Sequence, residues 1–201
     1  MNIMNKNIKL MENENAFKVL SRAQELEKRG KYIINLGIGQ PDFDPPKHVI
    51  EAAINSINEG NHGYSNSKGL LRLRETISKE YQTLYNCKIN PNKIIISPGA
   101  KPIIYMAISM LSNSNSEILI SNPSFPIYES IIKYCGGKPV HFNLKEINNF
   151  NFIADDIIEK ITNKTKLIIL NSPCNPTGSV IHIDQLKKLL NFVENLPYKV
   201  F

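Results

Sequence analysis

The stretch KLIILNSPCNPTGSV, residues 166–180, joins an apolar run to a segment crowded with proline, asparagine and glycine. A short run rich in leucine and isoleucine that ends at such residues is typical of a buried β-strand followed by a turn. The turn can simply redirect the chain. It can also present polar groups at the carboxyl edge of a sheet, where open α/β folds bind their ligands. The rest of the chain decides between these two interpretations.

The second half of the chain predicts four apolar strands that alternate with helices. The strands are expected at 93–97, 117–121, 138–142 and 166–171, and the helices at 101–111, 126–135, 155–161 and 184–195. This alternation predicts an α/β fold, with a mostly parallel sheet that carries helices on both faces. The segments SPGAK (97–101), SNPSF (121–125) and NSPCNPTG (171–178) then fall at the strand ends. We therefore expect one polar edge that binds a ligand.

The first half is predicted to be mainly helical. Helices are expected at 16–29, 46–60 and 69–86, with a short strand at 32–36. Gly30 suits the position after a helix, and Pro46 suits a first helical turn. The final PYKVF (197–201) resembles the start of a further strand, so we expect the fold to continue past it.

The composition favours an ordinary cytoplasmic globular protein. Of 201 residues, 42% are hydrophobic, and no apolar run reaches the roughly 18 residues of a membrane helix or forms a signal peptide. The net charge is +6, but the lysines are scattered, so we expect no nucleic-acid partner. Cys87, Cys135 and Cys174 form no CxxC pair, and the four histidines lack metal-ligand spacing. The sequence therefore predicts reduced thiols, no metal site and no membrane partner.

Two glycine-containing segments are candidates for binding a phosphate. GIG (37–39) begins like a dinucleotide motif but lacks the third glycine, so we reject it. SPGAKP (97–102) is the better candidate, because a strand ends there and a helix begins. The N–H groups of Ala100 and Lys101 would point at an anion, and Gly99 would allow its close approach. The alternative is an ordinary strand-to-helix turn.

Three side chains near predicted turns could contact a ligand. Phe125, in the loop after the strand at 117–121, could stack on a flat ring or cap the core. Asn175 is held out of the helical region by the proline after it, so its amide could face a ligand oxygen or form an Asx turn. Tyr64 precedes a helix and could bind a ligand or serve a structural role.

Taken together, these motifs resemble the class I/II aminotransferases, the fold-type-I enzymes that use pyridoxal 5′-phosphate. The chain is most similar to the aspartate-aminotransferase-like branch, from about residue 15 to its end. The segments that carry the resemblance are NLGIGQPDFDPPKHVIEAA (35–53), GYSNSKGLLRLRE (63–75), IIISPGAKPIIY (94–105), NPSFPIYESIIKYCGGKPV (122–140) and TKLIILNSPCNPTG (165–178). NPTG after an apolar strand is a strong signal, and its order with the other segments makes it very specific.

The resemblance implies that this chain holds part of a cofactor site. Gly99, Ala100 and Lys101 would bind the phosphate of pyridoxal 5′-phosphate. Phe125 would stack on the pyridine ring, and Asn175 would hydrogen-bond the phenolic oxygen. The turn that ends the opening stretch would then present Asn175 at the edge of the sheet.

The resemblance also implies substrates, partners and domains. The substrates would be an L-amino acid, with an aspartate-like donor, and a 2-oxo acid. Gly39 would offer its N–H to the substrate α-carboxylate, which Asn175 would help to orient. Tyr64 would reach the phosphate in the neighbouring subunit of a homodimer. Residues 1–45 would form an N-terminal arm and a small-domain or active-site segment, and 46–201 the first part of the cofactor-binding large domain.

The resemblance places the family's Schiff-base lysine beyond Phe201. The same holds for the aspartate at the pyridine nitrogen, a tyrosine on the phenolic oxygen and the arginine that binds the α-carboxylate. We therefore assign no catalytic residue and expect no amino transfer by this chain alone. Two hypotheses follow: the chain is the N-terminal part of an aminotransferase, or it is a non-catalytic remnant that binds a partner subunit or the cofactor without turnover.

Two structural expectations complete the prediction. The resemblance implies cis peptide bonds at Asn122–Pro123 and Asn175–Pro176, although few X–Pro bonds are cis in folded proteins. A sheet that lacks its later strands leaves apolar surface unprotected. We therefore expect poor solubility or self-association of the 201-residue chain.

Overall fold

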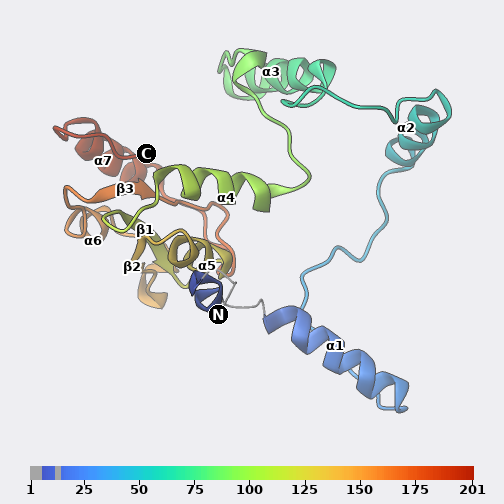
Figure 1. The fold of residues 1–201 in the computed structure, drawn as a ribbon, viewed down its shortest axis with the longest axis horizontal. Helices are drawn as coiled ribbons and strands as arrows, with labels where there is room; N and C mark the ends of the chain where they lie inside the picture. The colour runs from blue at the N-terminus through green and yellow to red at the C-terminus, as the bar shows by residue number, and fades with distance from the viewer. Residues whose placement is uncertain (1–5, 12–14) are drawn as a thin grey trace. The chain divides into compact units, whose positions relative to one another are not determined.

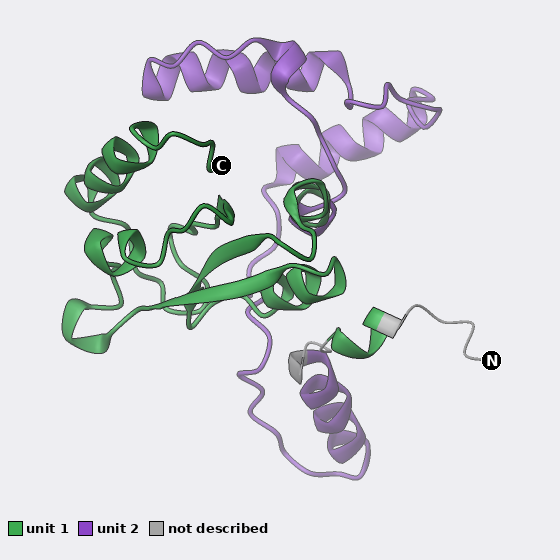
Figure 2. Ribbon diagram, turned by 60° about the vertical axis from the view of Figure 1, so that its left-hand side comes forward, with its two compact units in different colours: residues 1–15, 103–201 green, residues 16–102 purple. Residues whose placement is uncertain are grey.

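The computed structural model describes residues 6–11 and 15–201 (Figure 1). These residues form two compact units (Figure 2). The first unit contains the segment at 6–11 and Ile103–Phe201, and the second is Ala16–Pro102. The domain boundary predicted between residues 45 and 46 stays a prediction.

The first unit is built on a three-stranded parallel sheet. Its strands are β1 (Glu117–Asn122), β2 (Lys138–Asn143) and β3 (Thr165–Ile168), in the spatial order β2-β1-β3. The central strand is the most deeply buried, since residues 118–120 have no exposed surface. A strand covered on both faces must be apolar at successive positions, and Ile-Leu-Ile meets this condition.

Helices pack on both faces of the sheet, as predicted. They are α4 (Ala100–Leu111), α5 (Ile127–Tyr134), α6 (Ala154–Ile158) and α7 (Ile183–Glu194). Ile118 and Ile120 of β1 belong to a core cluster with residues of α4 and α5. Leu119 belongs to the cluster formed with α6 and α7. Because successive strand residues point to opposite faces, one strand contributes to both clusters.

The end of the chain pairs with β3. The N–H of Phe201 donates to the carbonyl of Lys166 (3.0 Å), and its own carbonyl accepts from Ile168 N–H (2.8 Å). One residue that bonds to two residues spaced in this way is the pattern of a parallel bridge. Of the strand start expected at 197–201, Phe201 therefore lies beside β3, on the side away from β1, whereas residues 196–198 form a bend.

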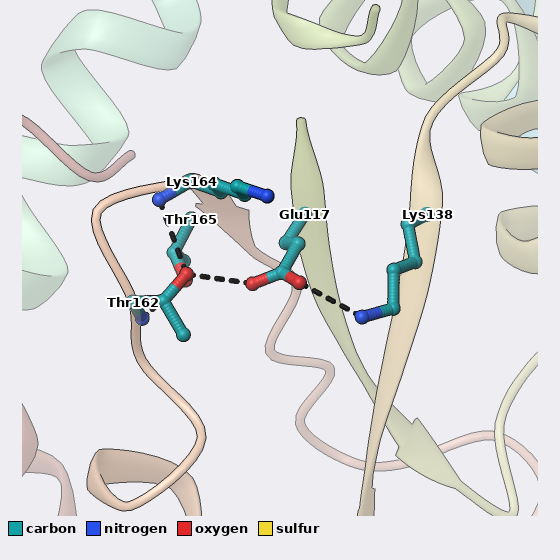
Figure 3. Close-up of polar contacts among 5 residues, drawn as sticks. All are labelled: Glu117, Lys138, Thr162, Lys164 and Thr165. Atoms are coloured by element: carbon teal, nitrogen blue, oxygen red, sulfur yellow. Dashed lines mark hydrogen bonds and ion pairs between the residues drawn. The ribbon is translucent and has the colours of Figure 1, made fainter. Parts of the chain in front are cut away.

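A carboxylate links the amino ends of the three strands (Figure 3). Glu117, the first residue of β1, accepts hydrogen bonds from Thr162 Oγ1 (2.7 Å) and from Lys138 Nζ (2.9 Å). Lys138 begins β2, and Thr162 precedes β3, where its N–H donates to Thr165 Oγ1 (2.9 Å). The hydrogen bonds from Thr162 and then Lys138 hold the pKa of the Glu117 carboxyl below its usual value. This group is 8% exposed, so the bonds replace much of its hydration.

The second unit consists mainly of helices and the loops between them (Figure 2). The helices are α1 (Asn15–Lys28), α2 (Lys47–Asn58) and α3 (Leu71–Tyr85). The segment around α3 is held by Arg74, which is 5% exposed and donates to the carbonyls of Gly69 (3.2 Å) and Pro91 (3.0 Å). By contrast, α2 has no buried residue.

Short 3-10 helices complete the description. They are η1 (Lys6–Leu10), η2 (Pro91–Lys93) and η3 (Glu146–Asn148). In the first unit, η1 is held on α5 by a hydrogen bond from Asn7 Nδ2 to the carbonyl of Tyr134 (2.9 Å).

The strands predicted at 32–36 and 93–97 are wrong. Residues 32–36 join no sheet, and Tyr32 and Leu36 are about nine-tenths exposed. Residues 94–97 follow η2, and there Ile96 N–H donates to the carbonyl of Lys68 (3.0 Å) without forming a ladder. The apolar pattern identifies extended residues, but a strand also needs a neighbour to supply its hydrogen bonds. Within the described residues, neither segment has one.

Candidate functional site

The turn that carries Asn175 follows the carboxyl end of β3. Pairing with β1 continues to Ile169, whose N–H donates to the carbonyl of Leu119 (2.9 Å). The chain then forms a tight turn. Cys174 N–H donates to the Ser179 carbonyl (2.9 Å), and Gly178 N–H donates to the Cys174 carbonyl (2.7 Å). These two bonds close the loop formed by residues 174–179.

Asn175 itself is exposed at the tip of this turn. Its side-chain amide makes no hydrogen bond with any residue that the structure describes, so the Asx turn considered above is not formed. The cis bond predicted at Asn175–Pro176 is confirmed, as is the one at Asn122–Pro123. A third cis bond, Ser172–Pro173, was not predicted. The amide of Asn175 is therefore available to an outside acceptor or donor.

Phe125 lies beyond the carboxyl end of the neighbouring strand, β1. Because β1 and β3 are adjacent and parallel, the loops that carry Phe125 and Asn175 leave the same edge of the sheet. The Phe125 ring is half-buried and meets the Tyr128 ring edge-on, with centroids 5.8 Å apart and planes at 90°. It thus contributes to the core cluster beneath α4 and α5 while keeping some exposed surface. A stacking role for that surface stays a prediction.

Two residues at this edge were not singled out as site residues. Tyr128 on α5 is buried, and burial raises the pKa of its phenol. Electrostatic interaction with Cys174 raises this pKa further. Cys174 is a free thiol buried in the core cluster beneath α6 and α7. The sequence analysis predicted the helix that carries Tyr128 but gave no role to this residue. The sequence analysis did not link Tyr128 to Cys174, because the two residues lie in distant segments of the chain.

The predicted phosphate-binding segment begins α4. Gly99 has φ +89°, and a side chain built there would meet no atom within 4 Å. The Gly99 carbonyl accepts from the Ser97 hydroxyl, and α4 starts at Ala100. The N–H groups of Ala100 and Lys101 lie in the first helical turn, where no intrahelical acceptor is available. The local geometry therefore suits an anion, although Lys101 directs its ammonium toward Phe17, 5.7 Å from the ring centroid.

Gly39 and Tyr64 belong to the second unit. Gly39 is exposed, and a Cβ there would meet no atom within 4 Å. The Tyr64 side chain is fully exposed and lines an open cleft of about 490 Å³ with Asn61, Ser65 and Arg72, among others. Both residues are accessible to a ligand or partner. Their roles stay predictions.

The rest of the described chain offers little competing chemistry. Over residues 6–11 and 15–201, no three histidine, cysteine, aspartate or glutamate side chains gather as metal ligands would. Over the same residues, no helix is both long and apolar enough to cross a bilayer.

Comparisons with known proteins agree on one family. The model of the family described as aminotransferase class I and II matches residues 31–199. A (5-formylfuran-3-yl)methyl phosphate transaminase of Methanocaldococcus jannaschii is 39% identical over 90% of this chain and 46% of its own length. An aspartate aminotransferase of Bacillus subtilis is 36% identical over 85% of this chain and 44% of its own.

A solved structure gives the same result for the fold. The aspartate aminotransferase of Thermus thermophilus with maleate matches with a TM-score of 0.93 and 25% identity, over 100% of this chain and 52% of that one. The chain thus spans about half the length of the relatives that it matches.

Proposed function

Because the chain belongs to the class I and II aminotransferase family, we propose that it forms part of a pyridoxal-5′-phosphate-dependent aminotransferase site. The reaction would transfer an amino group between an L-amino acid and a 2-oxo acid. An aspartate-like donor is favoured by the aspartate aminotransferases among the relatives, while the furan-phosphate transaminase shows that related chains act on other substrates. We propose a cytoplasmic homodimer as the working form.

The observation that carries this proposal is the exposed amide of Asn175. The loop that carries Asn175 leaves the same edge of the sheet as the loop that carries Phe125. No described residue forms a hydrogen bond with the Asn175 amide. Asparagine offers both an acceptor oxygen and donor hydrogens, so it can bond a phenolic oxygen and also orient a carboxylate. A turn closed by two backbone hydrogen bonds holds this group out toward solvent. We propose that Asn175 contacts the cofactor's phenolic oxygen and the substrate carboxylate.

The donor groups of the chain fit the cofactor. The open backbone at Gly99 and the N–H groups of Ala100 and Lys101 in the first turn of α4 suit a phosphate dianion. The exposed part of the Phe125 ring offers an apolar face for a flat heterocycle. Gly39 would donate its N–H to the substrate carboxylate, and Tyr64 would bind the phosphate of the partner subunit.

Pyridoxal 5′-phosphate, when bound, supplies the electron sink that stabilises charge at the substrate α-carbon. The residues of this chain would then bind the phosphate, orient the ring and hold the carboxylate. The lysine that moves the proton is proposed to lie outside these 201 residues. Lys101 is no substitute, because its backbone would lie at the phosphate.

The first experiment measures cofactor binding by the 201-residue chain. Pyridoxine 5′-phosphate is a suitable probe, since it has the ring, the phenolic oxygen and the phosphate but no aldehyde to react with lysines. We expect Asn175→Ala to weaken its binding about five- to ten-fold, as the loss of one hydrogen bond would. Asn163→Ala is the matched control, because Asn163 is an exposed asparagine before β3, at the opposite edge. Equal binding by wild type and Asn175→Ala would contradict the assignment.

The second experiment separates the enzyme from a non-catalytic remnant. The longest natural form of the chain is loaded with pyridoxal 5′-phosphate, reduced with borohydride and mapped, and amino transfer from aspartate to 2-oxoglutarate is assayed. The proposal expects one labelled lysine beyond Phe201 and measurable transfer. Binding of the probe without transfer in that form would favour the remnant, and a single labelled lysine within residues 1–201 would refute our placement of the catalytic group.

A further inference from the structure

A hydroxyl in the loop that carries Asn175 bonds to a distant segment of the first unit. Ser179 Oγ donates to the carbonyl of Phe150 (2.9 Å), which lies 29 residues earlier in the chain. The same hydroxyl lies 2.9 Å from Thr177 Oγ1 within the loop. Ser179 is half-buried, so water competes only partly for these bonds. One side chain thus joins the loop at 174–179 to a separate segment.

The backbone on the accepting side has an unusual conformation. Asn149 and Phe150, directly after η3, have φ values of +50° and +55°. Asparagine tolerates this left-handed region, but phenylalanine is rarely found there. The N–H of Phe150 donates to the Lys145 carbonyl (3.0 Å), which helps to hold this conformation. The Phe150 carbonyl, fixed in this way, accepts the bond from Ser179.

Side-chain packing does not fill the space beneath this attachment. A cavity of about 20 Å³ lies there, with Phe150, Cys174 and Ser179 among its lining residues. That volume holds about one water molecule. On this side the Ser179 hydroxyl joins the loop to the Phe150 segment across a small gap in the packing, whereas Cys174 anchors the other end of the loop in the core.

We propose that Ser179 is the positioning residue of the Asn175 turn. Its bond to Phe150 fixes the loop at 174–179, and with it the direction of the Asn175 amide. Ser179 itself would touch neither cofactor nor substrate. A role of this positioning in catalysis rests on the function proposed above, whereas the ordering of the loop by Ser179 does not.

Hydrogen exchange on the 201-residue chain tests the ordering directly. The amides of Cys174 and Gly178 report on the two bonds that close the loop, and those of β1 report on the whole unit. We expect Ser179→Ala to lower protection at the two loop amides about five- to ten-fold and to leave β1 unchanged. Ser179→Thr keeps a hydroxyl and should restore the protection. Ser109→Ala is the matched control, since it removes a hydroxyl-to-carbonyl bond in α4.

Unchanged loop protection in Ser179→Ala would overturn the proposal. So would an equal loss at the loop and at β1, because that pattern indicates a general stability effect. If Ser179→Ala does not fold, the proposal is tested by Ser179→Thr alone. Loop protection below the wild-type level in Ser179→Thr would then overturn the proposal.

A separate ligand-binding measurement distinguishes a failure of this proposal from a failure of the proposed function. Wild type should bind pyridoxine 5′-phosphate more tightly than its 3-deoxy analogue, which lacks the phenolic oxygen. Ser179→Ala should lose most of this preference and Ser179→Thr should keep it. Equal binding of both probes by wild type would refute the role of Asn175 in the proposed function, while the exchange data would still decide whether Ser179 orders the loop.

Discussion

Replacing Glu117 with glutamine should weaken the first unit by an amount that depends on pH. The change keeps the shape of the side chain and removes its charge. Glu117 is 8% exposed and accepts from Thr162 (2.7 Å) and Lys138 (2.9 Å). It links the starts of β1 and β2 to the segment before β3 (Figure 3). Loss of the charge should therefore affect all three strands.

The size of the effect follows from these two contacts. A hydrogen bond to a charged group contributes about 1.5–3 kcal/mol and one to a neutral group about 0.5–1.5, so the Thr162 bond should lose about 1 kcal/mol. Lys138 is 71% exposed at its side chain, and such pairs contribute about 0.2–1 kcal/mol because water screens them. We expect a total loss of about 1.5 kcal/mol in the free energy of unfolding at pH 7, which would lower the urea midpoint by about 0.5–1 M.

The stability difference between wild type and Glu117→Gln should become smaller as the pH falls. Because the pKa of Glu117 is lowered in the folded state, the unfolded chain binds more protons in the acid range. The stabilisation by Glu117 is therefore complete above the ordinary glutamate value near 4.5 and is lost as the pH falls through the lowered pKa. Glutamine does not titrate, so the two proteins should converge in acid. Glu129, whose pKa is lowered chiefly by Lys133, is present in both and cancels from the difference.

Pulse proteolysis in urea measures this difference at protein concentrations low enough to limit self-association. Lys188→Gln is the control, because it breaks the exposed 2.7 Å pair with Asp155 and should change stability by less than about 1 kcal/mol. A difference between wild type and Glu117→Gln that stays constant from pH 7 to pH 3 would refute the electrostatic reasoning. So would a loss no larger than that of the control.

Three further predictions follow from the fold. Gly69→Ala should cost about 1 kcal/mol or more of local stability beyond the cost of Gly60→Ala, as measured by hydrogen exchange at the neighbouring helix of each. Both glycines have a positive φ, but a Cβ at Gly69 would lie 2.6 Å from the Cβ of Ile96, whereas a Cβ at Gly60 would meet no atom within 4 Å. Equal losses would show that φ alone decides. The 201-residue chain should self-associate in analytical ultracentrifugation, since apolar side chains such as Met106 (52%) and Met110 (78%) are exposed; a monomer with a sharp melt would contradict this. Borohydride treatment of this chain with pyridoxal 5′-phosphate should label no single lysine specifically, and one labelled lysine with amino transfer would reverse that conclusion.

The apolar pattern predicted the sheet of the first unit because the core there forms between segments that are close together in the sequence. Each strand is followed by a helix that covers it, so alternating segments already contain their packing partners. The pattern failed at 32–36 and 93–97, where extended residues have no neighbouring strand among those described. It could not distinguish these cases, since isoleucine-rich segments such as KIIIS and EILIS look alike until their partners are known.

The candidate site was predictable only as far as its local motifs. A helix that starts just after Gly99 and the turn at Asn175 were expected from short segments, and the structure contains both, with a positive φ at Gly99. The electrostatic effect of Cys174 on Tyr128 and the bond from Ser179 to Phe150 were not, because each joins segments far apart in the chain. Nothing in the sequence around Phe150 marked its carbonyl as an acceptor. Such attachments require the fold before they can be seen.

The two ends of the sheet differ in what their polar bonds hold. At the amino end, the Glu117 carboxylate bonds groups from two other segments and should contribute to the stability of the whole unit. At the carboxyl end, the Ser179 hydroxyl holds one exposed loop and should contribute to the order of that loop alone. Glu117→Gln should therefore lower protection at β1 and the loop together, whereas Ser179→Ala should lower it at the loop only. If both variants gave the same exchange pattern, the loop would be part of the core's cooperative unit, and the turn at Asn175 would need no positioning residue.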